Sequence, residues 1–137
     1  VGQQDLAVAH LQAALKLQPL HPRIQLALGK LYGSSSRQIE EARQLLISAL
    51  LQEPRQPGCV EAYHVLGALS CQLEELSTCR SSYVATFEAA VDMGDDKFAA
   101  LGISSAAMVS IQNHGEVLGL LEAQALGERG VTSGVLH

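Results

Sequence analysis

Apolar residues recur along this chain at the three- and four-residue spacing of an amphipathic helix, and one such pattern occurs twice. The two copies are Ala7, Leu11, Ala14 and Pro19, and then Ala42, Leu46, Ala49 and Pro54. Their internal spacings agree at every step, and the copies lie 35 residues apart. Because residues at i, i+4 and i+7 share one helical face, each copy predicts an amphipathic helix that a proline ends.

A second repeated element is a Leu-Gly pair that alternates with the first one. It occurs at Leu28-Gly29, Leu66-Gly67 and Leu101-Gly102. Glycine inside a helix costs about 1 kcal/mol relative to alanine, so its recurrence needs a reason in packing. We therefore expect each of the three glycines to admit the close approach of a neighbouring helix.

These patterns predict an all-helical chain without strands. The expected helices span residues 4–18, 22–33, 38–52, 59–72, 75–93, 95–112 and 115–127. Pro22 suits the first turn of the second helix. The glycines near the C-terminus predict a flexible tail over residues 128–137.

Composition supports one helical domain, since 47% of the 137 residues are hydrophobic and only 4% are aromatic. Leu, Ala, Val and Ile must therefore fill the core. The formal net charge is −5, which argues against binding to nucleic acid. Residues 1–58 hold six basic and four acidic side chains, whereas residues 59–137 hold three and ten, so a charged partner should meet a gradient along the molecule.

The three cysteines, Cys59, Cys71 and Cys79, are odd in number and show no zinc-ligand spacing. We expect all three to be reduced thiols in an intracellular, cytoplasmic protein. No apolar stretch approaches the roughly 18 residues of a membrane span, so membrane insertion is not expected.

The two repeated elements together resemble the tetratricopeptide repeat, a helix-turn-helix unit of about 34 residues. The second unit carries the resemblance with Gln25, Leu28, Gly29, Tyr32, Ala42, Leu46, Ala49 and Pro54, although Gln25 stands where the family has an aromatic residue. The third unit keeps Tyr63, Leu66, Gly67, Cys79, Tyr83 and Thr86 but lacks the closing proline, and the fourth keeps Phe98, Leu101, Gly102 and Ser105.

The resemblance implies an α-solenoid with the right-handed superhelix of that family and about three and a half repeats. The array would cover residues 1–127. Residues 1–21 would supply the second helix of a partial repeat, and residues 22–56, 57–94 and 95–127 would form full repeats. Since repeats bury their core only against neighbours, the uncovered first helix predicts marginal stability or self-association through the uncapped ends.

The resemblance also implies a concave groove, lined by the first helix of each unit, that holds a peptide or helix of a partner protein. The positions that would line it are Arg23, Leu26 and Lys30, then Glu61, His64 and Cys71, and finally Asp96, Ala99 and Ile103. Arg23 and Lys30 lie two helical turns apart and could together bind a carboxylate or phosphate, although ordinary solvated charges explain them equally well. The carboxylate clamp of members that bind chaperone tails is absent, since only Lys30 could substitute for it.

Other chemistry has little support in the sequence. His64 could contact a partner or sense pH, but a structural histidine is the favoured interpretation. Cys71 could be reactive, but a small buried side chain is favoured. No metal or cofactor is expected, and the chain holds none of the motifs GxGxxG, GxxxxGK[ST], GxSxG or HExxH, so we predict no enzymatic activity.

The leading hypothesis is therefore a protein-interaction scaffold or adaptor module within a larger protein. Two alternatives remain open. The chain could be a structural or oligomerising segment whose uncovered first helix docks on another copy, or it could be the recruitment domain of an enzyme whose catalytic part lies elsewhere.

Overall fold

The computed structural model describes the backbone of residues 2–35 and 38–129, and the side chains of residues 2–35 and 38–112. Every regular element in these ranges is a helix, which confirms the predicted all-α fold. The helices are α1 (Gln3–Leu17), α2 (Pro22–Ser35), α3 (Ile39–Gln52), α4 (Cys59–Gln72), α5 (Leu76–Met93) and α6 (Asp96–Arg129). The first five begin and end within two residues of the predicted bounds.

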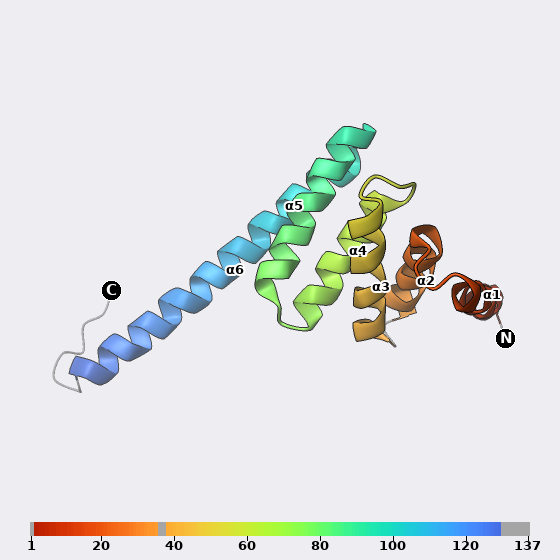
Figure 1. Ribbon diagram of the computed structural model, residues 1–137. Coiled ribbons are helices and arrows are strands. Elements are labelled where there is room, and N and C mark those ends of the chain that lie inside the picture. The colour runs from red at the N-terminus through yellow and green to blue at the C-terminus, as the bar shows by residue number, and fades with distance from the viewer. Residues whose placement is uncertain (1, 36–37, 130–137) are drawn as a thin grey trace.

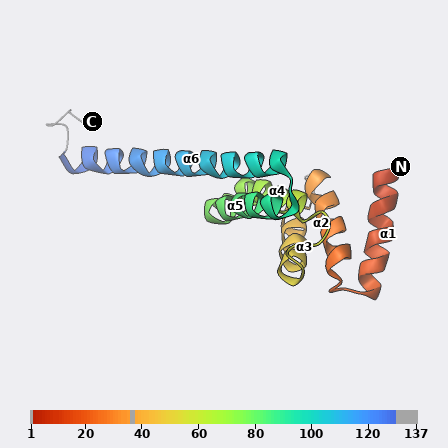
Figure 2. The ribbon, with the colours of Figure 1, turned by 90° about the horizontal axis from the view of Figure 1, so that it is seen from above.

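The helices stack in sequence order, as Figure 1 shows. The closest pairs are α2 with α3, α4 with α5, and α5 with α6, while α4 also packs on α2 and α3. In contrast, α1 contacts α2 alone among the described helices, and no residue of α1 is fully buried. At the other end, Figure 2 shows α6 projecting well beyond the body of the molecule.

One core runs through the middle of the stack. Its most deeply buried members include Leu28, Leu46 and Leu69, each at most 2% exposed, with alanines between them. Small residues at the crossings let the helices approach closely. Among the described helices, none is both long enough and apolar enough to cross a lipid bilayer.

The repeated glycines do lie at close helix contacts, as predicted. A Cβ atom on Gly29 would be 2.9 Å from Leu46 Cγ on α3, and one on Gly67 would be 2.6 Å from Tyr83 Cε1 on α5. Both of these glycines thus face the helix that follows their own. Gly102 on α6 instead faces the preceding helix, since its Cβ would lie 2.8 Å from the backbone N of Phe87 on α5. Consequently α5 is held between α4 and α6.

The predicted break of the last helix between residues 112 and 115 is wrong, because α6 is continuous from Asp96 to Arg129. The segment contains no proline, and a lone glycine such as Gly115 lowers helix stability by only about 1 kcal/mol relative to alanine. Residues 128 and 129, predicted to be part of the tail, are also helical. The remaining tail residues, 130–137, lie outside the described residues.

The prediction of three reduced thiols is also wrong, because Cys71 and Cys79 form a disulfide. The connection between α4 and α5 spans only residues 73–75, so the chain reverses direction abruptly and brings the two Cα atoms to 5.2 Å. This separation lies in the range of about 4.4–6.8 Å that a disulfide requires. Cys59 remains a buried thiol, and burial raises its pKa.

Candidate functional site

The residues predicted to line a concave groove do not form one open surface. Leu26 is 3% exposed and Ala99 is 8% exposed, and both belong to the core. Leu26 lies against the link before α4, where a Cβ on Gly58 would be 3.4 Å from its Cδ2. Neither side chain is available to a partner, contrary to the prediction, because the helix face they occupy is covered.

The two predicted cations of this surface have neighbours within the chain. Arg23 is exposed, and its Nε lies 3.7 Å from Glu53 Oε2. Lys30 is half-buried, and its Nζ would be 2.8 Å from a Cβ on Gly58, just before α4 begins. Both can still reach an anionic ligand, but Arg23 would have to leave an exposed ion pair, which stabilises a protein by about 1 kcal/mol or less.

The predicted residues further along the chain are scattered. Cys71 is joined to Cys79, so it is not a free thiol. Glu61 and Asp96 are exposed in the first turns of α4 and α6, where a negative charge favours the helix. Ile103 is 44% exposed and lines a shallow hollow between α5 and α6.

His64 lies among aromatic side chains where α4, α5 and α6 meet. Its ring centroid is 5.3 Å from that of Tyr83 and 6.0 Å from that of Phe98. Burial lowers the pKa of His64, because it disfavours the charged imidazolium. This position favours the structural interpretation of His64 over contact with a partner.

We expect the His64 site to make stability depend on pH. Below the ordinary pKa of 6.5, the unfolded chain binds a proton at this residue more readily than the folded chain. Stability should therefore fall as the pH falls from 6.5 to the lowered folded-state pKa. Urea denaturation at about pH 7.5 and about pH 5 measures this loss. His64→Phe keeps the ring packing without the charge, so it should lose less stability over that interval, and an equal loss would contradict the assignment.

An open groove lies elsewhere, between α1 and α3, with α2 as its floor. Its volume is about 720 Å³, within the range of about 300–1,000 Å³ that is usual for ligand clefts. The lining residues are Ala9, Gln12, Ala13, Leu15, Lys16, Pro19, Leu28, Tyr32 and Glu41. A second hollow of about 590 Å³ continues along α3 and shares Glu41 with the first. We call these two hollows together the α1–α3 groove.

The walls of the groove differ in chemistry. Ala9 and Ala13 lie one helical turn apart on α1, and their small side chains leave room above Leu28 and Tyr32. The amide of Gln12 donates a hydrogen bond of 2.6 Å to the Tyr32 hydroxyl, which links wall to floor. The floor is therefore apolar and fixed, while polar groups stand at the edges.

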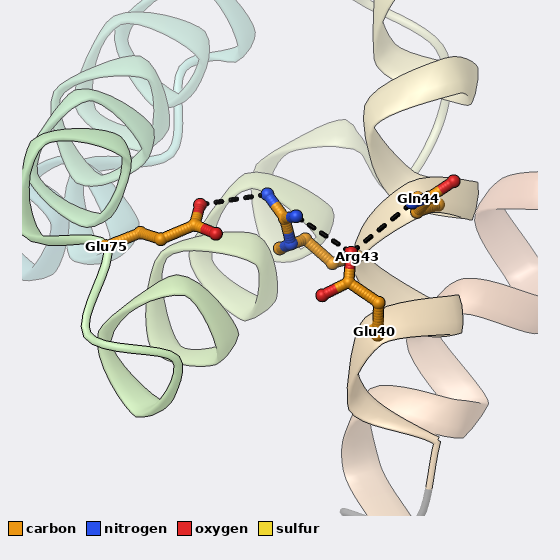
Figure 3. A network of polar contacts seen from close by, with 4 residues as sticks. All are labelled: Glu40, Arg43, Gln44 and Glu75. Carbon is orange, nitrogen blue, oxygen red and sulfur yellow. Dashed lines mark hydrogen bonds and ion pairs between the residues drawn. The ribbon is translucent and has the colours of Figure 1, made fainter.

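The gap between the next pair of helices, α3 and α5, is bridged instead. Arg43 Nη1 binds Glu75 Oε2 at 3.0 Å, just before α5 begins, and Arg43 Nη2 binds Glu40 at 2.8 Å (Figure 3). Hydrogen bonds from Arg43 and Gln44 lower the pKa of Glu40, so its carboxylate stays charged. A second bridge joins Arg55 Nε to Asp92 on α5 at 2.9 Å.

The internal repeat explains why the α1–α3 groove lacks these bridges. Thirty-five residues before Arg43 stands Val8, and the same offset from Arg55 leads to Leu20. Neither side chain can form an ion pair, and Leu20 is 72% exposed. The repeated pattern already contains this difference, since the sequence at positions 8 and 20 lacks the arginines found at 43 and 55, although the groove itself was not predicted.

No group of three His, Cys, Asp or Glu side chains capable of holding a metal ion occurs in the part of the chain that the structure describes. Comparison with models of protein families finds no match, and a search of curated proteins finds none with significant similarity.

Proposed function

We propose that this chain is a non-enzymatic protein-interaction module of the tetratricopeptide type, which binds a peptide or helix of a partner protein as a scaffold or adaptor. The α1–α3 groove is the observation that carries the proposal. It is open, apolar at its floor and polar at its edges, as peptide-binding clefts are.

The stacking of helix pairs supports the family part of the proposal. Gly29 and Gly67 each pack on the helix that follows, as the repeated motif requires, and the pairs α2–α3 and α4–α5 are the closest along with α5–α6. A cytoplasmic location belongs to the same proposal. The disulfide between Cys71 and Cys79 removes the argument from reduced cysteines that first suggested it.

Retention of partner proteins by the immobilised chain tests the function. We expect a specific set of proteins to be retained, and Ala13→Trp should remove it by filling the groove, because Ala13 lines the groove and is exposed. Ala100→Trp is the matched control, since Ala100 is an exposed helical alanine on α6. If the wild-type chain retains no more than an unrelated bead-bound protein, the proposed function is wrong.

A charge reversal tests the concave surface predicted from the sequence. Replacing Arg23 and Lys30 by glutamate should lower the affinity of that surface for an acidic ligand. The chain should stay folded, because neither side chain is fully buried. The affinity for each retained partner and the melting temperature check both statements. An unchanged affinity, together with a loss caused by Ala13→Trp, would assign binding to the α1–α3 groove instead.

A structural or oligomerising role is the second candidate, and one surface favours it. On α6, Leu101, Met108 and Ile111 are 43%, 65% and 66% exposed, and residues 98–112 contain no charged side chain. Exposed apolar side chains without charges are typical of interface cores. A mass that rises with protein concentration in sedimentation equilibrium would support this role.

A further inference from the structure

Two opposite charges stand at the α1–α3 groove without partners of their own. Lys16 and Glu41 both line it, and within residues 2–35 and 38–112 neither forms an ion pair. Glu40, beside Glu41, is already bound to Arg43. The groove thus offers one free cation and one free anion from the described residues to whatever enters it.

The two charges lie on opposite walls of the groove. Lys16 is in the last turn of α1, and Glu41 is in the first turn of α3. Both α1 and α3 pack along α2 through short connections, and Figure 2 shows α1 and α2 side by side and running in opposite directions. The axes of α1 and α3 are not parallel, since Figure 1 shows α1 end-on and α3 upright. Lys16 and Glu41 therefore reach the groove from two different helices, one on each wall.

The floor between these charges is apolar. Leu15, Leu28 and Tyr32 line it, and Leu45 continues the apolar lining along α3. A ligand that covers this floor must remove Lys16 and Glu41 partly from water, which is unfavourable unless the ligand brings an opposite charge to each. Charge complementarity therefore restricts which segments fit.

We propose that the α1–α3 groove binds a segment of a partner protein with an apolar centre, an acidic side chain that pairs with Lys16 and a basic side chain that pairs with Glu41. This inference rests on the proposed function and names the class of partner. The segment supplies the ion pairs that Arg43 and Arg55 provide across the neighbouring gap between α3 and α5. It occupies the position where α1 and α3 lack such bridges.

Three synthetic peptides with the same apolar centre of leucine and alanine test the inference. One carries glutamate at one end and lysine at the other, one carries lysine at both ends, and one carries glutamate at both ends. Each is labelled with fluorescein, and binding to the purified chain is measured by fluorescence anisotropy. The wild-type chain should prefer the mixed peptide by roughly fivefold, the scale of one exposed ion pair.

Single charge reversals should change this preference in opposite ways. Lys16→Glu gives the groove two acidic side chains at these positions, so the lysine peptide should bind best. Glu41→Lys gives it two basic side chains there, so the glutamate peptide should bind best. Circular dichroism establishes that both variants remain folded.

Two control variants change the net charge equally but lie outside the groove. Glu61 is the third residue of α4, as Glu41 is of α3, so Glu61→Lys matches Glu41→Lys in helix position. Lys97→Glu on α6 matches Lys16→Glu in charge. Both controls should keep the wild-type preference for the mixed peptide. A change of preference in Glu61→Lys would place binding on the concave surface and overturn the inference.

Other outcomes also decide the matter. Equal binding of all three peptides, or none, overturns the inference, while the proposed function is decided separately by the retention experiment, which uses no peptide. If the chain alone dimerises and either Lys16→Glu or Glu41→Lys abolishes the dimer, the occupant is a second copy, and the partner segment proposed here is wrong.

Discussion

Gly102→Ala should destabilise the fold more than the same change at Gly29, Gly33 or Gly67, the other helical glycines whose surroundings the structure describes. The new Cβ would lie 2.8 Å from Phe87 N and 2.9 Å from Tyr83 O, and both atoms belong to the backbone of α5. Because a helix backbone cannot move aside cheaply, α5 and α6 must separate along their contact. Overpacking of this kind lowers the free energy of unfolding by about 1–3 kcal/mol. Urea denaturation followed by far-UV circular dichroism measures the loss.

Gly67→Ala is the matched control, since Gly67 follows the equivalent leucine in α4. Its Cβ would meet the ring of Tyr83 at 2.6 Å, and this half-buried side chain can turn aside. The gain in helix propensity, about 1 kcal/mol for glycine to alanine, should then offset much of the clash. Equal losses at the two glycines would contradict the close backbone contact between α5 and α6.

Leu46→Ala should produce the other large loss, about 2–5 kcal/mol of unfolding free energy. Leu46 is fully buried and packs directly against Gly29, whose Cβ would lie 2.9 Å from it. Truncation leaves a cavity at the centre of the α2–α3 contact, which the neighbouring Ala42 is too small to fill. Because a domain is typically stable by only about 5–15 kcal/mol, the variant should unfold at a clearly lower urea concentration.

Leu51→Ala on the same helix provides the comparison for Leu46→Ala. Leu51 is 78% exposed, so its truncation should change stability by no more than about 0.5 kcal/mol. The same urea titration measures both. A loss at Leu51 that rivals the one at Leu46 would mean that α3 turns a different face to the core.

Much of the fold could be predicted from the sequence, because helical periodicity and chain breakers act locally. The spacing of Ala42, Leu46 and Ala49 identified the buried face of α3, and all three are fully buried. The helix contacts at Gly29 and Gly67 were predicted on the same basis. The spacing of these residues along the sequence is enough to predict which side of each helix is packed, without knowledge of the tertiary arrangement.

The wrong or missing predictions concern features that depend on contacts between residues far apart in the chain or on how the chain turns. The disulfide depends on how sharply the chain reverses between Cys71 and Cys79. In the candidate site, Lys16 and Glu41 line one groove only because α1 and α3 both pack on α2, so no local motif marked the groove.

The attachment of α1 to the rest of the molecule has a consequence for dynamics. Among the described helices α1 packs on α2 alone, and it buries none of its residues fully, so it should open as a unit at a free energy well below that of global unfolding. Its amide hydrogens would then exchange with solvent earlier than those of α3 or α4. A ligand seated between α1 and α3 must hold α1 in place, and part of the binding free energy is used to order it. Slower amide exchange across α1 is therefore the expected signature of an occupied groove. Because α1 is loosely held, the groove can also adapt its width to the segment that it binds.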